Sequence, residues 1–297
     1  MRIVTVMLFL VILWVGCIPK HAVYPVRSVT IAYKKLDSSQ LNLHLFYPPN
    51  FNAHNKYPVF LFFYGGGWLN GDIHQFERQA KYFASRGLIT AMADYRIFKT
   101  HKSTPFDAVR DAKSAIRYLR SHSESLHIHP DKIIAGGGSS GGHLAAAADL
   151  TRLEEPGEDQ GVSSRPNALV LFNPVFDNGP GGYGYDRIGS RYPEISPIHN
   201  IKNGAAPTIV FLGTNDNAVP VSTAELYKQK MEQSGNRCDL FTYKDQKHGF
   251  FNDEQFFYET VKEADIFLSS LGYLKGKPTI RKSTFNSIES SYKYKRN

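Results

Sequence analysis

The chain has 297 residues, of which 42% are hydrophobic and 21% are charged, and its formal net charge is +8 at pH 7. This length and apolar content exclude a disordered chain and favour one large folded domain with a well-buried core. Cys17 and Cys238 are the only cysteines, so a disulfide framework is excluded as well.

The first residues form an apolar leader. Residues 3–18 are apolar apart from Thr5 and Gly16 and follow a single Arg2, and this run is short for a membrane-spanning helix of about 20 residues. We therefore expect a signal peptide over residues 1–20. The last residues before Cys17 resemble the end of a bacterial lipoprotein signal, in which the cysteine is lipidated. An ordinary cleaved signal and an uncleaved anchor are the alternatives.

This leader predicts an exported protein, either periplasmic or tethered to the membrane as a lipoprotein through Cys17. At the other end, residues 275–297 carry seven Lys or Arg and one Glu, with little apolar periodicity. We expect an exposed basic tail there, and one folded domain over residues 21–274. No nucleic-acid motif accompanies the positive charge, and export argues against such a partner.

Strand-like and helix-like patterns alternate along the domain. A helix is predicted from Pro105, because Val109, Ala112, Ile116 and Leu119 recur at steps of three and four. A second long helix is predicted from about residue 253. Strands are predicted at residues 27–33, 41–47, 57–64, 88–93, from about 132, 168–174, 207–213 and 237–244. Such alternation is typical of a mostly parallel sheet flanked by helices.

The strand at residues 57–64 is apolar throughout, as expected for a strand buried on both faces, and it runs into Gly65, Gly66 and Gly67. Glycines at the carboxyl end of a strand allow backbone N–H groups to approach a ligand closely. The alternative is a simple tight turn before a helix that Asp72 and Gln75 would start as a capping box.

Residues 133–147 join an apolar strand, a Gly-Ser turn and an Ala-rich helix. Residues 137–141 fit G-x-S-x-G with Ser139 as nucleophile, on a sharp turn beside backbone N–H groups of a helix start. A frame shifted by one residue makes Ser140 the nucleophile. The glycines also fit the dinucleotide pattern G-x-G-x-x-G, for which Glu154 or Glu155 would have to supply the acidic partner.

An acid and a base follow in chain order. Asp216 lies in a loop after the strand at 207–213, and His248 lies after the strand at 237–244. The order Ser, Asp, His, each after a strand, is that of one hydrolase architecture. Asp177, which follows the strand at 168–174, is the other candidate acid.

The polar loops at residues 154–166 and 176–197 are expected to shape a substrate pocket, because such sheets bind ligands at the carboxyl ends of their strands. Tyr183, Tyr185 and Tyr192 lie in the second loop. Their rings could stack on a sugar or an aryl group, and packing within a surface loop is the alternative.

Four motifs in register resemble the α/β-hydrolases of the hormone-sensitive-lipase and acetyl-esterase type. YGGGW stands where that family has HGGGW, GGSSGGHLA matches its nucleophile motif, and GTNDNAVP and HGF match its acid and base motifs. The resemblance runs from about residue 27 to 274 and aligns the nucleophile with Ser139. It implies an α/β-hydrolase fold with a mostly parallel central sheet and flanking helices. The short stretch before residue 57 predicts no large cap domain.

The resemblance also implies an activity, that of a serine carboxylic-ester hydrolase. Ser139 would attack, His248 would act as the base and Asp216 would orient it. The N–H groups of Gly65, Gly66 and Ser140 would bind the oxyanion, and the hydroxyl of Ser140 would be dispensable.

No metal or organic cofactor is expected for this chemistry. The expected substrates are small-molecule esters with short acyl groups, including acetylated or acylated carbohydrates. The alternative is a non-catalytic ligand-binding protein on the same fold.

Overall fold

A computed structural model describes residues 27–281 of the chain. The expected signal peptide, the lipidation site at Cys17 and most of the expected basic tail lie outside the described residues. Cys238 is buried and unpaired, and burial raises the pKa of its thiol to about 12. A thiol with this pKa stays protonated and unreactive at neutral pH.

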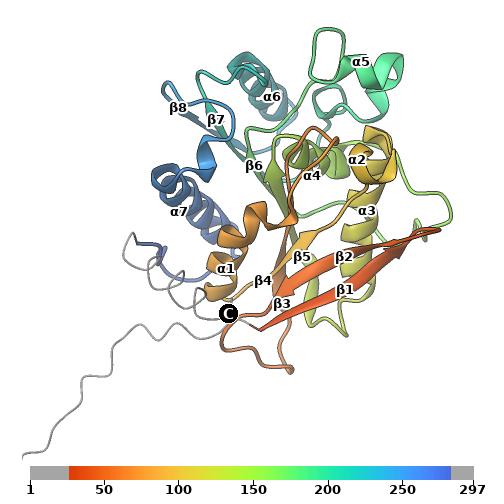
Figure 1. Ribbon diagram of the computed structural model, residues 1–297. Coiled ribbons are helices and arrows are strands. Elements are labelled where there is room, and N and C mark those ends of the chain that lie inside the picture. The colour runs from red at the N-terminus through yellow and green to blue at the C-terminus, as the bar shows by residue number, and fades with distance from the viewer. Residues whose placement is uncertain (1–26, 282–297) are drawn as a thin grey trace, which may run out of the picture.

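Eight strands form one sheet in the order β1-β2-β4-β3-β5-β6-β7-β8 (Figure 1). β1 and β2 pair antiparallel, β2 pairs antiparallel with β4, and all later neighbours pair parallel. The strands are β1 (Ser28–Lys35), β2 (Gln40–Phe46), β3 (Tyr57–Phe63), β4 (Ile89–Ala93), β5 (Ile128–Gly138), β6 (Ala168–Phe172), β7 (Thr208–Gly213) and β8 (Cys238–Tyr243). The predicted mostly parallel sheet is confirmed, although β5 begins at Ile128, before the predicted residue 132.

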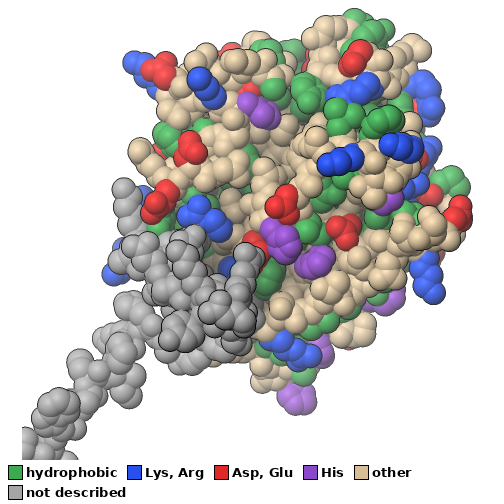
Figure 2. All heavy atoms as spheres, in the orientation of Figure 1, with side chains coloured by type: hydrophobic (Ala, Val, Ile, Leu, Met, Phe, Trp, Pro, Cys, Tyr) green, Lys and Arg blue, Asp and Glu red, His purple; other side chains and the backbone are tan. Residues whose placement is uncertain are grey.

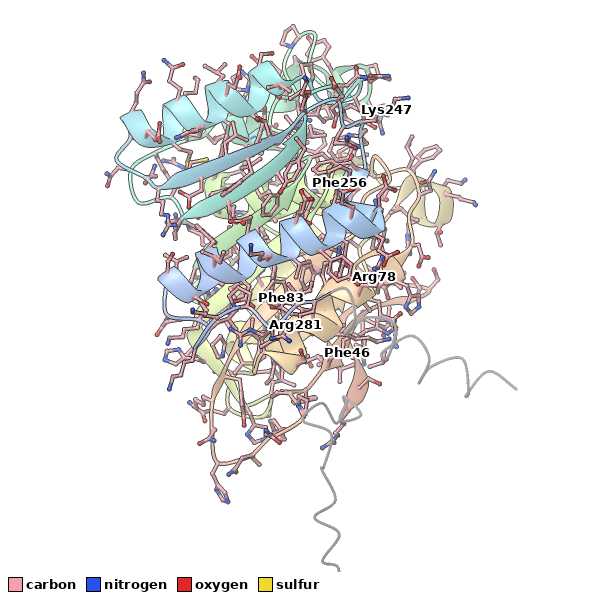
Figure 3. The ribbon with its side chains drawn as sticks, turned by 90° about the vertical axis from the view of Figure 1, so that its left-hand side faces the viewer. Phe46, Arg78, Phe83, Lys247, Phe256 and Arg281 are labelled. Carbon is pink, nitrogen blue, oxygen red and sulfur yellow. The ribbon has the colours of Figure 1, made fainter. Side chains whose placement is uncertain are left out.

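Helices cover both faces of this sheet. The helices are α1 (Glu77–Ser85), α2 (Phe98–His101), α3 (Pro105–Ser121), α4 (Ser140–Leu150), α5 (Tyr185–Ile188), α6 (Val221–Gln233) and α7 (Glu254–Ser270). Short 3₁₀ helices are η1 (Ile73–Phe76), η2 (Gly189–Glu194), η3 (Pro197–His199) and η4 (Phe250–Asn252). Helices α3, α4 and α6 pack on one face, and α1 and α7 pack on the other. Figure 3 looks onto the second layer, with Phe83 of α1 and Phe256 of α7 labelled.

The side chains of β3 show why both faces of the sheet need covering helices. Successive side chains of a strand point to opposite faces, so Leu61 and Phe63 join the core beneath α3 and α4 while Phe60 and Phe62 join the core beneath α1 and α7. All four side chains are almost fully buried. The expectation that residues 57–64 form a strand buried on both faces is therefore confirmed.

Between β6 and β7 the chain forms the short helices α5, η2 and η3, and residues 27–281 contain no large helical cap. No helix within residues 27–281 has the length and apolar character needed to cross a membrane. On the face that Figure 2 displays, acidic and basic side chains are interspersed. The net positive charge does not form a single basic patch on that face.

The chain after α7 returns to the domain. Backbone carbonyls of Lys275 and Gly276 accept hydrogen bonds from Arg86, and the N–H of Thr279 donates to the Tyr82 hydroxyl. The side chain of Ile280 packs against the core beneath α1 and α7. Residues 275, 276, 279 and 280 of the expected basic tail therefore contact the domain beyond the expected boundary at residue 274.

The buried carboxylate of Asp265 connects the end of α1 with α7. It is fully buried in α7, accepts from Arg86 Nε at 2.6 Å and from the Tyr82 hydroxyl at 2.5 Å, and so joins α7 to α1. Removing one member of a buried ion pair leaves the other charge without compensation.

We predict that Asp265→Asn lowers the free energy of unfolding by about 3 kcal/mol, measured by urea denaturation, because Arg86 keeps its charge and loses its buried partner. Asp239→Asn is the matched control. Asp239 pairs with Arg237 where both side chains are partly exposed, so that change should cost about 1 kcal/mol or less. Equal losses in the two variants would contradict a special role for the buried pair.

Candidate active site

Ser139 sits at a strained turn between β5 and α4. Its backbone has φ 53° and ψ −118°, a conformation that a residue with a Cβ rarely adopts. Close packing enforces the turn, since a Cβ on Gly141 would lie 2.1 Å from the carbonyl oxygen of Phe63 in β3. The turn therefore needs glycine at position 141. This steric requirement explains the last glycine of the G-x-S-x-G pattern.

The structure brings Ser139, His248 and Asp216 into one hydrogen-bonded row. His248 Nε2 lies 2.9 Å from Ser139 Oγ, and His248 Nδ1 lies 2.7 Å from Asp216 Oδ2. The second oxygen of Asp216 accepts from the N–H groups of Ala218 and Val219, which fixes the carboxylate. With Nδ1–H directed at Asp216, the Nε2 lone pair faces the serine hydroxyl and can take its proton.

The alternative residues have other partners. Ser140 is fully buried and its Oγ accepts from the N–H of Gly67 at 2.9 Å, so it does not face the imidazole. Asp177 accepts from the N–H of Gly179 and lies near His199. The structure therefore assembles the row with Ser139 and Asp216, and not with Ser140 or Asp177.

Asn173 is a site residue that sequence reasoning missed. Its Oδ1 accepts from the N–H of Gly249, next to His248, and its Nδ2 lies 3.5 Å from His248 Nε2. Its positive φ of 35° turns the chain at the carboxyl end of β6. Asparagine tolerates this conformation better than most residues, so Asn-Pro directly after a buried strand was the available signal.

The glycine loop differs from expectation at one donor. The N–H of Gly65 donates to Gln75 Oε1 at 2.7 Å, so it is not free to bind an oxyanion, and its assignment to the oxyanion hole is corrected. Gly66 is exposed at the site, and its N–H has no partner among residues 27–281. Since Ser140 begins helix α4, its N–H is also free of intrahelical bonds. Among residues 27–281, the N–H groups of Gly66 and Ser140 are thus two free donors beside Ser139.

The same contact overturns the capping-box alternative. Asp72 does cap η1 by accepting from the N–H of His74, but Gln75 reaches Gly65 instead of returning to the cap.

Tyr64 stands where relatives of this motif have histidine. Its ring stacks on Tyr95 with centroids 4.3 Å apart, and the Tyr95 hydroxyl donates to the Tyr64 carbonyl at 2.8 Å. Burial raises the pKa of both phenols, so they remain neutral hydrogen-bonding groups. The pair holds the start of the glycine loop.

His143 of α4 takes no part in the row. It is fully buried, and its Nε2 lies 2.9 Å from the Ile195 carbonyl. Burial lowers its pKa to about 4, so the ring is neutral at pH 7. Its ring packs edge-on against that of Trp68, with centroids 4.9 Å apart. Since Trp68 directly follows Gly67, this contact stabilises the glycine loop.

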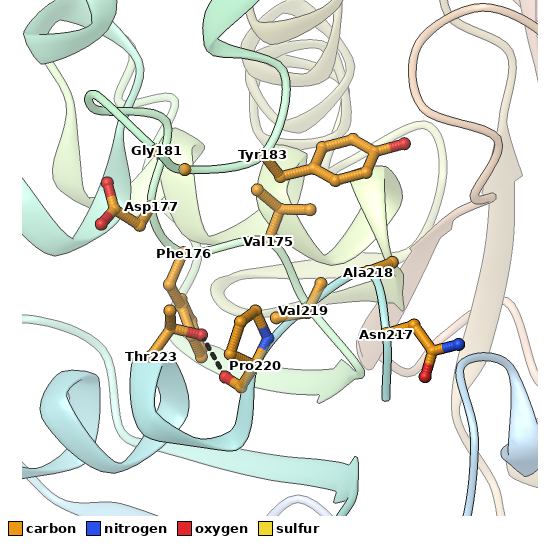
Figure 4. A pocket seen from close by; sticks show the side chains of 11 residues that line it. Val175, Phe176, Asp177, Gly181, Tyr183, Asn217, Ala218, Val219, Pro220 and Thr223 are labelled. Carbon is orange, nitrogen blue, oxygen red and sulfur yellow. Dashed lines mark hydrogen bonds between the residues drawn. The ribbon is translucent and has the colours of Figure 1, made fainter. Parts of the chain in front are cut away.

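Two pockets open at this edge of the sheet. The catalytic pocket holds about 280 Å³ and is lined by Gly65, Gly66, Gly67, Asn70, Gln75, Gly138, Ser139, Asn173, Tyr183, His248, Gly249 and Phe251. A side pocket of about 240 Å³ lies between the segments at 175–183 and 217–223, and Figure 4 shows Val175, Val219 and Tyr183 on its walls. Tyr183 lines both pockets.

The other predicted pocket residues lie elsewhere. Tyr185 and Tyr192 contact each other and line neither pocket. The loop at 154–166 lines neither pocket, because its acidic residues pair with cations of α3 and β1. Those pairs are Lys113 and Arg117 with Glu154, Arg117 with Glu158, and Lys34 with Glu155. Glu154 and Glu155 are thus engaged in ion pairs and are not a ribose-binding acid, which removes the dinucleotide interpretation.

No group of three or more His, Cys, Asp or Glu side chains that could hold a metal ion occurs in the part of the chain that the structure describes. The site brings together a serine, an imidazole, a carboxylate and free backbone donors, which are the components of acyl transfer.

Known proteins resemble this chain in both halves. A family model described as BD-FAE matches residues 43–170, and the dienelactone hydrolase family model matches residues 174–275. A probable isoprenylcysteine alpha-carbonyl methylesterase of Oryza sativa subsp. japonica is 28% identical, covering 64% of this chain and 50% of the relative. The acetylxylan esterase of Xylanibacter ruminicola is 25% identical, covering 72% of this chain and 44% of the relative. The chain spans about half the length of the curated relatives it matches.

A solved structure matches this chain over a larger share of both proteins. A thermophilic esterase from the planctomycete Thermogutta terrifontis superposes with a TM-score of 0.80 and 39% identity, over 84% of this chain and 94% of that one. Its sheet, like the one described above, belongs to the α/β-hydrolase fold. On the strength of this fold, this identity and the two family models, the chain belongs to the carboxylesterases of the α/β-hydrolase superfamily.

Proposed function

We propose that this protein is a serine carboxylic-ester hydrolase that works through Ser139, His248 and Asp216. The observation that carries the proposal is the row of two hydrogen bonds, 2.9 and 2.7 Å long, which opens onto a pocket of about 280 Å³. A buried acid, an imidazole and a hydroxyl on a strained turn are the parts that acyl transfer requires.

The reaction proceeds in two halves. His248 Nε2 takes the proton of Ser139 as Oγ attacks the ester carbonyl carbon, and the carbonyl electron pair moves onto oxygen. The N–H groups of Gly66 and Ser140 donate hydrogen bonds to this oxyanion. His248 then passes the proton to the departing alcohol oxygen as the C–O bond breaks, which leaves an acyl-enzyme. Water, deprotonated by His248, attacks the acyl group, and the acid leaves as Ser139 regains its proton.

We propose short acyl esters, among them acylated carbohydrates, as substrates. The catalytic pocket is at the small end of ligand pockets, and its lining includes the neutral amides of Asn70, Gln75 and Asn173 beside the Tyr183 ring. Amides bind hydroxyl groups, and an aromatic ring can stack on a sugar. The Thermogutta esterase has been solved with propionate and with butyrate bound, and the Xylanibacter relative is an acetylxylan esterase.

A hydrolysis panel tests this function. Aryl esters from acetate to palmitate, together with acetylated and feruloylated sugars, should be cleaved with the highest kcat/KM for acyl chains of two to four carbons. The panel also separates an enzyme from a non-catalytic binding protein on the same fold. Binding of these esters without turnover would support the second alternative.

We predict that Ser139→Ala lowers kcat on a short aryl ester by about 10⁴-fold or more while the fold remains intact, because the nucleophile is lost. The variant should also resist covalent labelling by paraoxon, whereas Ser140→Ala should still be labelled. Mass spectrometry of the intact protein measures both. Labelling of Ser139→Ala at position 140 would show that the frame is wrong.

We predict that Asp216→Asn lowers kcat by about 10³ to 10⁴. Asparagine keeps the oxygen that accepts from Ala218 and Val219 but cannot orient His248 with a negative charge. Asp177→Asn is the control at the alternative acid and should stay within a few-fold of wild type, since Asp177 does not contact His248. The reverse pattern in folded variants would reassign the acid.

We also propose export, and attachment to the membrane through a lipidated Cys17. The sequence of residues 1–20 is the support for it. Cys17→Ser should move the protein out of the membrane fraction, as uncleaved precursor or soluble protein, with activity per molecule unchanged. Mass spectrometry of the mature N-terminus is the measurement, and an unmodified chain that starts after Cys17 would refute lipidation.

A further inference from the structure

The glycine loop is fixed by side chains on both sides of its free donor. The N–H of Gly65 donates to Gln75 Oε1 at 2.7 Å, and the N–H of Gly67 donates to Ser140 Oγ at 2.9 Å. Between them, Gly66 offers an N–H that has no partner among residues 27–281. Of three consecutive donors, the loop therefore leaves only the middle one for a ligand.

The carbonyl groups of the loop are occupied as well. Gly66 O accepts from the N–H groups of Leu69 and Asn70, and Gly67 O accepts from Arg187 Nη1 at 2.6 Å. These bonds fix the orientation of the peptide planes around Gly66. A donor that is fixed before the reaction stabilises an oxyanion more strongly than one that must reorient.

The two anchors differ in what surrounds them. Ser140 is fully buried, so it belongs to the core behind the loop. Gln75 comes from η1 and lines the catalytic pocket. Its Oε1 lies 3.5 Å from the point where a Cβ of Gly65 would stand, and the Cβ of Ser139 lies 3.4 Å from the same point. Gln75 thus anchors the loop right beside the nucleophile.

We propose that Gln75 is a positioning residue of the oxyanion hole: its side-chain oxygen binds the N–H of Gly65 and so directs the N–H of Gly66 toward the developing oxyanion. This inference rests on the proposed ester hydrolysis. Without the Gln75 oxygen, the Gly65 N–H loses its partner. The Tyr64–Gly65 peptide then keeps the bond from the Tyr95 hydroxyl to the Tyr64 carbonyl, so the Gly66 N–H that follows this peptide is held less firmly.

The test compares three variants by steady-state kinetics and by inhibition with a short alkyl boronic acid, which forms an anionic tetrahedral adduct on a reactive serine. Gln75→Leu keeps the size of the side chain and removes the acceptor. Gln75→Glu keeps an acceptor and adds a carboxylate near the oxyanion. Gln79→Leu is the matched control, the same substitution one helical turn away, at a buried residue that lines neither pocket.

For Gln75→Leu we expect kcat to fall about 10- to 100-fold, at most the effect of losing one oxyanion donor, with KM within about three-fold of wild type. The boronate inhibition constant should rise by a similar factor. Gln79→Leu should retain kcat within about two-fold. For Gln75→Glu we expect the ratio of its kcat to that of wild type to rise as pH falls from about 7 to about 4, through the ordinary pKa of a Glu carboxyl, because protonation removes the negative charge beside the oxyanion.

Wild-type kcat and wild-type boronate affinity in Gln75→Leu would overturn the inference and leave the proposed function intact. If that variant fails to fold, the pH-dependent ratio of Gln75→Glu decides, and a ratio that does not change with pH overturns it. Wild-type protein that cleaves no ester of the panel would refute the proposed function, and this inference with it.

Discussion

The site depends on one close approach, that of Gly141 at the start of α4 to the carbonyl of Phe63 at the end of β3. No side chain fits between them, so α4 can begin directly against the neighbouring strand. The chain then turns so tightly that Ser139 adopts a positive φ, and its hydroxyl points out from the end of the sheet. The same approach brings Ser140 next to the glycine loop after β3. The proposed nucleophile and the proposed oxyanion donors thus come from two strands that are neighbours in the sheet.

The rest of the site follows from parallel strands. β6, β7 and β8 all end at the edge where β5 ends, and the loops after them deliver Asn173, Asp216 and His248. Ser139 and His248 are 109 positions apart in the chain, and Asp216 and His248 are 32 apart. Their short side chains can still form hydrogen bonds, because the sheet places the three loops next to one another. Burial of the strands on both faces makes this edge rigid, which suits a site that must hold its donors in place.

Polar groups buried behind the site are neutral and hydrogen-bonded. The Tyr95 hydroxyl donates to the Tyr64 carbonyl and the Ser140 hydroxyl accepts from the N–H of Gly67, so buried neutral groups hold the glycine loop. Their neutrality matters, because an ionised group there would be costly to bury and would change the field at the oxyanion. His143 is neutral for the same reason, with a pKa that burial lowers to about 4. The charged networks lie further away, along α3 and between α1 and α7, where they join elements instead of facing the substrate.

The sequence alone determined the parts that depend on local chemistry. The apolar runs of β3 and β7, the glycines around Ser139 and the chain order of Ser139, Asp216 and His248 were enough to predict the fold class and to nominate the row. Tertiary structure decided which groups are free and which are already bonded. Gly65, Gly66 and Gly67 look alike in the sequence, yet Gln75 binds one N–H and Ser140 binds another. Likewise, Glu154 and Glu155 belong to a loop that composition assigned to the pocket, but cations on α3 and β1 hold it elsewhere. A hydrogen bond or ion pair between residues far apart in the chain leaves no periodic trace, so only the folded arrangement could assign these partners.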